Sequence, residues 1–360
     1  MDKTRVLICD DSALMRSSLR KIIESDPELC VAGTARDGED AVAKARELRP
    51  DVITMDINMP GIDGITALQI IMAEEIAPVL MVSSLTQEGA EITFEALALG
   101  AFDYVFKPGG TVSAQMGPAA REIIRKVKAA TRSGTLGRLS RKAPASREAA
   151  RGQRAQSISR GTRNKGIGGG YSFKAVALGI STGGPKTLFE VLPLLPADLN
   201  AAVFVVQHMP PAFTSAFAER IDANCPMKCV ETKAGTVVEP GTIYLARGGY
   251  HLTLYKKSNN ELVLRTPQKP DHTFIPSVDV MMNSVSETFG SDTVGVLMTG
   301  MGDDGADAMV KIVQTGGTTI AESEESAIVF GMPREAIERG GAQIIAPSWG
   351  IAQKVIRAVG

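Results

Sequence analysis

The chain has 360 residues and a formal net charge of −1 at pH 7, so we expect two domains of about 100–200 residues each, and whole-chain charge gives no argument for binding nucleic acid or an anionic surface. Its four cysteines have neither the spacing of a disulfide framework nor that of a zinc site, which favours reduced thiols in a cytoplasmic protein. No stretch approaches the roughly 20 apolar residues of a membrane span, so we expect no membrane insertion.

The first 130 residues alternate short apolar runs with amphipathic patterns. In chain order, strands are predicted at 5–9, 30–35, 52–56, 78–83 and 103–106, and helices at 13–24, 37–48, 88–99 and 118–131. This alternation predicts a doubly wound parallel sheet with helices on both faces. In such a sheet the functional residues gather at the carboxyl ends of the strands.

Polar residues end or directly follow four of these predicted strands. They are Asp10, Asp11, Asp56, Ser83 and Lys107. Clustered carboxylates repel one another unless a cation lies among them, and their hard oxygen atoms suit Mg²⁺. A lysine opposite the metal would hold a phosphate group. Helix capping would explain one of these aspartates alone, but it would not require Lys107.

The same five residues resemble the motif set of the receiver domains of two-component response regulators. Ser12, the segment 56–61 (Asp-Ile-Asn-Met-Pro-Gly) and Pro108 complete the pattern. Residues 1–130 therefore resemble a receiver domain, which implies a flavodoxin-like fold.

This resemblance also implies the roles of individual residues. Asp56 would accept a phosphate group from a histidine kinase as an acyl phosphate, and Mg²⁺ would be bound for that reaction. The implied metal ligands are Asp10, Asp11 and Asp56. The implied switch residues are Ser83, Tyr104 and Lys107.

Residues 131–170 have a different composition. They include ten basic side chains and only one acidic side chain, Glu148, and glycine, serine and alanine make up most of the remainder. Because such a segment cannot bury enough apolar surface to offset its ordering entropy, we expect a flexible, disordered linker. An electrostatic arm for nucleic acid or an acidic partner is the alternative. The segment has no aromatic residue for base stacking, so we expect no nucleic-acid partner.

The stretch 179–184, Gly-Ile-Ser-Thr-Gly-Gly, opens the functional part of residues 171–360. It follows a predicted buried strand at 174–179 and precedes a predicted amphipathic helix at 185–195. It matches the Gly-x-Ser-x-Gly pattern that exposes a nucleophilic serine on a sharp turn, here Ser181. Two alternatives are an ordinary helix N-cap and a glycine loop that cradles a nucleotide phosphate.

Of the three histidines, His208 has the position best suited to reach Ser181. It directly follows the apolar strand predicted at 201–206 and precedes a proline-rich loop. His251 lies in an alternating, hairpin-like pattern that is typical of an exposed strand residue. His272 lies in a polar loop and is not excluded.

A third predicted strand, at 293–298, leads into a glycine-rich turn at 299–305 that carries Asp303 and Asp304. Such a turn suits an aspartate that orients an imidazole beside amides that stabilise an oxyanion, or a metal or ribose site. Serine, histidine and aspartate at three strand ends allow a catalytic triad. Their order, Ser…His…Asp, differs from that of α/β-hydrolases.

Four segments of residues 171–360 closely resemble the chemotaxis protein-glutamate methylesterase family. They are Gly-Ile-Ser-Thr-Gly-Gly-Pro, Val-Val-Gln-His-Met-Pro, Leu-Met-Thr-Gly-Met-Gly-Asp-Asp-Gly-Ala and Val-Phe-Gly-Met-Pro-Arg-Glu-Ala. The resemblance implies a Rossmann-like α/β catalytic domain after the linker. It implies a triad of Ser181, His208 and Asp304, the aspartate that directly precedes glycine, with the backbone N–H of Met301 as the oxyanion donor.

The family resemblance implies an enzyme that hydrolyses glutamate γ-methyl esters on chemoreceptors, releases methanol and also deamidates receptor glutamines. Phosphorylation of Asp56 would relieve occlusion of the active site by the receiver. The ester chemistry would need no cofactor, and we expect a monomer. The alternatives are a DNA-binding response regulator, which predicts a small helical output module, and a nucleotide-binding output, which lacks a Gly-Lys-[Ser/Thr] motif.

Overall fold

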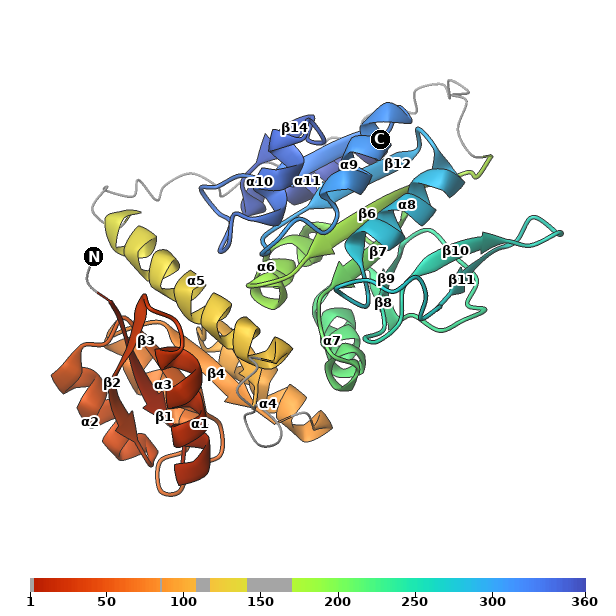
Figure 1. Ribbon diagram of the computed structural model, residues 1–360. Helices are drawn as coiled ribbons and strands as arrows, with labels where there is room; N and C mark the ends of the chain where they lie inside the picture. The colour runs from red at the N-terminus through yellow and green to blue at the C-terminus, as the bar shows by residue number, and fades with distance from the viewer. Residues whose placement is uncertain (1–2, 85, 108–116, 141–169) are drawn as a thin grey trace, which may run out of the picture.

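The computed structural model describes residues 3–84, 86–107, 117–140 and 170–360. These residues form two α/β domains, each built on a parallel sheet, which confirms the predicted fold class (Figure 1). Within the described residues, none of the helices is long and apolar enough to cross a membrane. The four cysteines are free thiols, as expected.

The N-terminal domain has a five-stranded sheet in the order β2-β1-β3-β4-β5, with every ladder parallel. Its strands are β1 (Thr4–Cys9), β2 (Leu29–Ala35), β3 (Val52–Asp56), β4 (Val79–Ser83) and β5 (Asp103–Phe106). Its helices are α1 (Ala13–Glu24), α2 (Gly38–Leu48), α3 (Gly64–Ala73), α4 (Gln87–Ala98) and α5 (Pro118–Ser140).

Side-chain hydroxyls and carboxylates begin the first four of these helices. Ser12, Asp37, Asp63 and Thr86 are in extended conformation, and each accepts a hydrogen bond from a backbone N–H in the first turn. Asp37 lies at the start of the helix predicted at 37–48 and is the N-cap of α2. Helices α1 and α5 pack on one face of the sheet, and α2, α3 and α4 pack on the other.

Two features of this domain differ from the sequence prediction. Helix α3 was not predicted, because its apolar side chains outnumber its polar ones and weaken the helical period. Helix α5 continues to Ser140 instead of ending at residue 131. Most of the predicted linker, residues 141–169, lies outside the described residues.

The C-terminal domain has a seven-stranded sheet in the order β14-β13-β12-β6-β7-β9-β8, again with every ladder parallel. Its strands are β6 (Lys174–Ile180), β7 (Ala201–Gln207), β8 (Lys228–Glu231), β9 (Thr242–Leu245), β12 (Thr293–Leu297), β13 (Thr318–Glu322) and β14 (Ile344–Ala346). A separate antiparallel hairpin joins β10 (Thr253–Lys256) and β11 (Leu262–Arg265).

Helices cover both faces of this sheet. They are α6 (Gly184–Val191), the 3₁₀ turn η1 (Leu192–Leu194), α7 (Pro211–Asn224), α8 (Val278–Phe289), α9 (Ala306–Gln314), α10 (Met332–Glu338) and α11 (Ser348–Val359). Helices α6, α7 and α11 pack on one face and α8, α9 and α10 on the other. The proline-rich loop predicted after His208 is mainly helix α7, which has Pro211 in its first turn, where a proline is tolerated.

The order of the strands reverses between β12 and β6, at the centre of the sheet. The chain runs from β6 outward through β7 to one edge, then returns to β12 and continues to the other edge. In doubly wound sheets this switch point creates a crevice at the carboxyl ends of the strands. Strands β12, β6 and β7 are direct neighbours, so the residues that follow them share this crevice.

One hydrophobic cluster continues from the N-terminal domain into the C-terminal domain. It joins the α4 face of the first sheet to the α6 and α7 face of the second. The two domains therefore share packed apolar surface at α4 and α7, which lie side by side in Figure 1.

Candidate active site

Ser181 lies directly after β6, on a turn that only glycines allow. Gly183 has φ +76°, in the left-handed region, and occupies the N-cap position of α6. A Cβ on Gly184 would collide with the side-chain oxygen of Gln207. Because Gly183 holds the N-cap position, the alternative of Ser181 as an ordinary helix cap is wrong.

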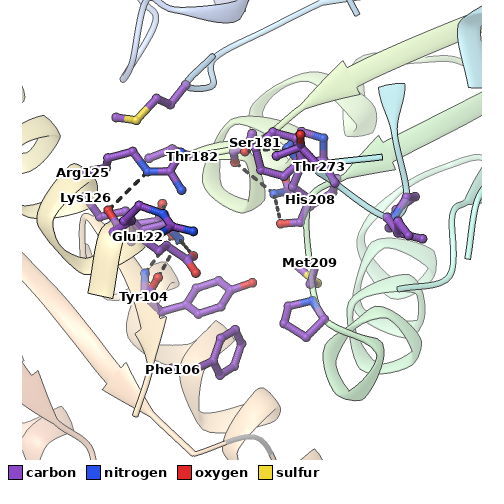
Figure 2. Close-up of a pocket in the computed structure, with 18 residues that line it drawn as sticks. Tyr104, Phe106, Glu122, Arg125, Lys126, Ser181, Thr182, His208, Met209 and Thr273 are labelled. Carbon is purple, nitrogen blue, oxygen red and sulfur yellow. Dashed lines mark hydrogen bonds and ion pairs between the residues drawn. The ribbon is translucent and has the colours of Figure 1, made fainter. Parts of the chain in front are cut away.

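The structure brings the three side chains of the predicted triad into one hydrogen-bonded chain. His208 Nδ1 lies 3.1 Å from Ser181 Oγ, and His208 Nε2 lies 2.8 Å from Asp304 Oδ2. The contact between Ser181 and His208 is visible in Figure 2. With Asp304 ionised, Nε2 carries the ring proton and Nδ1 is free to accept the serine proton.

Asp304 is held at the N-terminus of α8. Its carboxylate accepts hydrogen bonds from the hydroxyl of Ser277 at 2.8 Å and from the backbone N–H groups of Val278 at 2.8 Å and Asp279 at 3.0 Å. Burial acts to raise the pKa of Asp304, but the bond to His208 and these N–H groups lower it to about 2. The carboxylate is therefore ionised throughout the neutral range.

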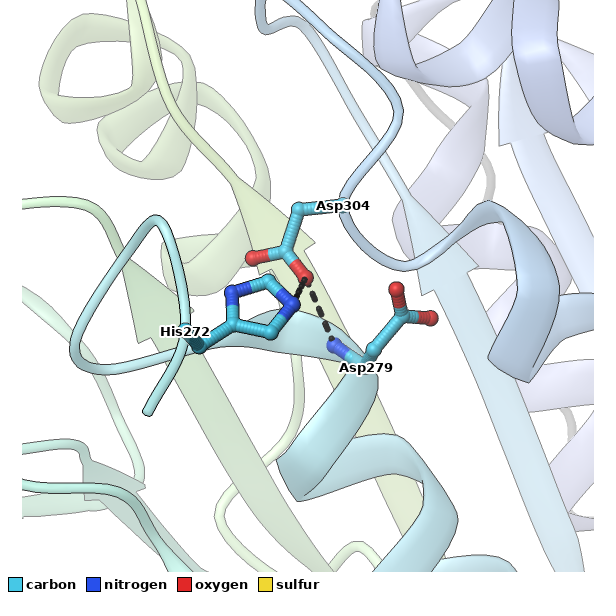
Figure 3. A group of neighbouring side chains, drawn as sticks. All are labelled: His272, Asp279 and Asp304. Atoms are coloured by element: carbon cyan, nitrogen blue, oxygen red, sulfur yellow. Dashed lines mark hydrogen bonds and ion pairs between the residues drawn. The ribbon is translucent and has the colours of Figure 1, made fainter. Parts of the chain in front are cut away.

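His272 lies beside this carboxylate without contacting the serine. Its Nε2 is 3.9 Å from Asp304 Oδ1, and Figure 3 shows its ring edge directed at Asp304, with Asp279 below. These three side chains could offer ligand atoms to a metal. The Asp304 carboxylate is already occupied by four hydrogen-bond donors, so we interpret the group as a polar network around the triad.

The prediction for His251 was wrong. It is fully buried and precedes β10, which begins at Thr253, instead of lying exposed on a strand. The alternating pattern reflects a chain segment that packs against the 267–277 loop, and periodicity within one segment carries no information about such a partner.

The loop after β12 lies against the turn that carries Ser181. The backbone N–H of Ser181 donates to the carbonyl oxygen of Thr299 at 2.9 Å, and the Thr299 hydroxyl donates to the carbonyl oxygen of Thr182 at 2.9 Å. A Cβ on Gly300 would lie 2.9 Å from the Cβ of Ser181. Met301, the predicted oxyanion donor, follows in this loop and lines the same cavity as Ser181 and His208.

The predicted phosphorylation site forms at the carboxyl edge of the first sheet. Lys107 Nζ lies 2.8 Å from Asp56 Oδ2 and 3.4 Å from Asp10 Oδ2, and both aspartates are buried. Asp11, which is exposed, completes a group whose ligand atoms lie within 4.8 Å of one another. Burial raises the pKa of Asp10 and of Asp56, and the charge of Asp56 raises that of Asp10 further.

Two of the three predicted switch residues, Ser83 and Tyr104, are buried. Ser83 Oγ accepts a hydrogen bond of 2.8 Å from the Thr93 hydroxyl on α4. The Tyr104 ring stacks on Phe213 of α7, with centroids 5.3 Å apart. Tyr104 therefore touches the C-terminal domain, which the sequence did not reveal.

Comparisons with known proteins match both halves of the chain. A family model described as CheB methylesterase covers residues 176–355, and one described as response regulator receiver domain covers residues 6–113. A relative from Syntrophomonas wolfei, named protein-glutamate methylesterase/protein-glutamine glutaminase 3, is 58% identical over 357 residues, which are 99% of each chain. The chain belongs to the CheB methylesterase family.

Two further comparisons support the same family. A protein-glutamate methylesterase/protein-glutamine glutaminase from Caldanaerobacter subterraneus is 50% identical and covers 99% of this chain and 97% of its own. The crystal structure of the Thermotoga maritima CheB methylesterase catalytic domain matches with a TM-score of 0.51 and 38% identity, over 52% of this chain and all of that domain.

In this CheB family member the receiver forms one wall of the cavity that contains Ser181 and His208. A cavity of about 480 Å³ lies between the domains, lined by Ser181 and His208 on one side and by residues of β5 and α5 on the other. Figure 2 shows Glu122, Arg125 and Lys126 facing the esterase residues across it.

A buried carboxylate of the receiver contacts the turn that carries Ser181. Asp103 Oδ2 accepts a 3.1 Å hydrogen bond from the backbone N–H of Gly183 and lies 3.3 Å from Lys126 Nζ. Burial raises the pKa of Asp103, against the opposing effect of Lys126. Sequence reasoning missed this contact, because it joins positions 80 residues apart on different domains.

Proposed function

We propose that this CheB family member hydrolyses γ-methyl esters of glutamate side chains on chemoreceptors, releasing methanol, and deamidates receptor glutamines through the same acyl-enzyme. The observation that carries the proposal is the hydrogen-bonded chain from Ser181 through His208 to Asp304. The names of relatives that match nearly the whole chain support the choice of substrate.

Acylation would begin when Ser181 Oγ attacks the ester carbonyl carbon. His208 Nδ1 accepts the serine proton as the new C–O bond forms. The imidazolium is stabilised by Asp304, whose carboxylate is kept ionised by the N-terminus of α8. His208 then returns the proton to the departing methoxide, so that methanol leaves and an acyl-enzyme remains.

During acylation, negative charge develops on the carbonyl oxygen of the ester and must be stabilised by a hydrogen-bond donor. We assign this role to the backbone N–H of Met301, a residue of the loop after β12 that lines the cavity. In deacylation, water attacks the acyl carbon, His208 accepts a proton from the water, and Ser181 leaves with that proton. The product is a glutamate carboxylate from either substrate, and the amide releases ammonia in place of methanol.

Methanol release from methylated receptor tests this function directly. Purified full-length protein should produce methanol and, from the same methylated side chains, an equal amount of glutamate, faster in the presence of a small phosphodonor and Mg²⁺. Failure to release methanol from any methylated receptor, with or without phosphodonor, would contradict the proposal.

Asp56 is the proposed acceptor of the phosphate group, and Mg²⁺ fits the carboxylates around it. Apart from the ion-pair contact with Lys107 Nζ at 3.4 Å, Asp10 Oδ2 has no hydrogen-bond partner among the described residues, and burial raises the pKa of both Asp10 and Asp56. Buried carboxylate oxygens of this kind suit a divalent cation. Asp10, Asp11 and Asp56 would hold the ion, which would neutralise the incoming phosphate. A histidine kinase is the proposed donor.

Asp56→Asn should retain the basal esterase rate but show no increase with phosphodonor, because the amide cannot form the acyl phosphate. The measurement is methanol release with and without phosphodonor, with the wild-type protein as control. If the variant is stimulated as strongly as the wild type, Asp56 is not the acceptor.

The packing between the domains supports occlusion as the basal state. Phe94 on receiver helix α4 stacks on Phe217 of α7 at 5.0 Å and meets the edge of Phe213 at 5.9 Å. Rearrangement of the receiver on phosphorylation would have to separate these rings to open the cavity.

Phe94→Ala should therefore raise the basal rate about fivefold, since an aromatic pair contributes about 1 kcal/mol beyond its buried area and about 1.4 kcal/mol corresponds to a factor of ten. The rate with phosphodonor should stay close to that of the wild type, because that state is already open. A variant whose basal rate is unchanged would show that this contact does not restrain the esterase.

A further inference from the structure

The buried histidine outside the triad holds the loop that supports the triad. We propose that His251 is a positioning residue for the esterase reaction, acting through the 267–277 loop. Its role rests on the proposed esterase function, and it concerns how the imidazole of His208 and the carboxylate of Asp304 are kept in place.

His251 is fully buried and binds this loop at three points. Its backbone N–H donates to the carbonyl oxygen of Pro267 at 2.7 Å. Its ring Nε2 lies 2.9 Å from the carbonyl oxygen of Pro270, and its ring Nδ1 lies 3.2 Å from the backbone nitrogen of Ser277. One side chain thus ties the first half of the loop to its last residue.

The two ring partners fix the state of the imidazole. A carbonyl oxygen can only accept a hydrogen bond, so Nε2 must carry a proton toward Pro270. A backbone N–H can only donate, so Nδ1 must present its lone pair to Ser277. His251 is therefore held as a neutral ring in one tautomer, and leucine at this position would keep the bulk while losing both bonds.

The far end of the loop touches two members of the triad. The Phe274 ring stacks on the His208 ring with centroids 4.2 Å apart and planes 10° from parallel. The Ser277 hydroxyl donates to Asp304 Oδ1 at 2.8 Å. Stacking limits rotation of the imidazole, and the hydroxyl limits rotation of the carboxylate. Loss of the His251 bonds would release both constraints while leaving every triad residue in the chain.

Three variants separate the contributions of the two ring nitrogens. His251→Leu removes both bonds. His251→Asn keeps an acceptor near the position of Nδ1, where it can bind the Ser277 N–H. His251→Gln keeps a donor near the position of Nε2, where it can bind Pro270.

The rate at which a fluorophosphonate labels Ser181 in the full-length protein measures the reactivity of the nucleophile, and the final extent of labelling measures how much protein is folded. His251→Leu should lower the labelling rate and kcat for methanol release about 10- to 100-fold, the loss expected from a misplacement of about 1 Å, with little change in the final extent or in KM. His251→Asn should recover most of the rate, and His251→Gln less.

Phe289→Leu is the matched control. Phe289 is buried in the same domain, packs on Tyr171 and Phe173, and is the last residue of α8, at the end opposite the one that binds Asp304. It should lower the melting temperature but leave the labelling rate unchanged.

Two results would overturn the positioning role of His251. Either His251→Leu is labelled as fast as the wild type, or its final extent of labelling falls while its labelling rate stays unchanged. A wild-type protein that is not labelled at Ser181 even in the presence of phosphodonor and Mg²⁺ would instead contradict the proposed esterase function itself.

Discussion

Ser181→Ala should lower kcat for methanol release on the order of 10⁶-fold, as in other enzymes that lose a triad nucleophile. Without Oγ no acyl-enzyme forms, and His208 has no proton to accept at the 3.1 Å contact seen here. Methanol release from methylated receptor, in the presence of phosphodonor, measures the loss.

Ser215→Ala is the matched control for this substitution. Ser215 lies on α7 and makes an exposed hydrogen bond to Glu219. It should retain the wild-type rate. Retention of most activity by Ser181→Ala would show that another group attacks the ester and would remove the triad assignment.

Asp304→Asn should lower kcat by about 10⁴-fold, by analogy with the same change in a serine protease triad. The asparagine amide would donate to His208 Nε2, which would move the ring proton to Nδ1. Nδ1 would then face Ser181 as a donor and could not accept its proton. The rate of methanol release across neutral pH measures this effect.

Asp303→Asn is the control, because it makes the same chemical change one residue away. The Asp303 side chain is 64% exposed and pairs with Arg339 on the surface, so its variant should keep the wild-type rate. Equal losses in the two variants would contradict the assignment of Asp304 to the triad.

The depressed pKa of Asp304 also has a consequence for stability. Its folded value of about 2 lies below its ordinary value of 3.8, so folding favours the ionised form. This stabilisation is present above about pH 4 and is lost as the pH falls through about 2. Acid unfolding followed by circular dichroism would measure this effect. The loss of stability that the wild-type protein shows between about pH 4 and about pH 2 because of Asp304 should be absent in Asp304→Asn.

Much of the fold could be predicted because it depends on local patterns. Apolar runs separated by amphipathic segments predicted the parallel sheets, and their ends placed Ser181, His208 and the turn before Asp304 at neighbouring strands. The choice of Asp304 over Asp303 came from family resemblance, and the structure brings Asp304 to His208.

The support for this site could not be predicted, because it comes from segments that are distant in the chain. Ser277 reaches Asp304 from 27 residues upstream, and Asp103 reaches Gly183 from another domain. No periodicity within one segment encodes such contacts. The burial of His251 was mistaken for exposure for the same reason.

The apolar cluster shared by the two domains predicts how the proposed opening of the cavity depends on temperature. In the proposed opening, Phe94 leaves Phe217 and Phe213, and aromatic surface passes into water. Hydration of such surface carries a positive heat-capacity change, so the free energy of opening is a curved function of temperature. The ratio of basal to stimulated activity should therefore have a curved temperature dependence that comes from the opening step and not from the chemical step at Ser181.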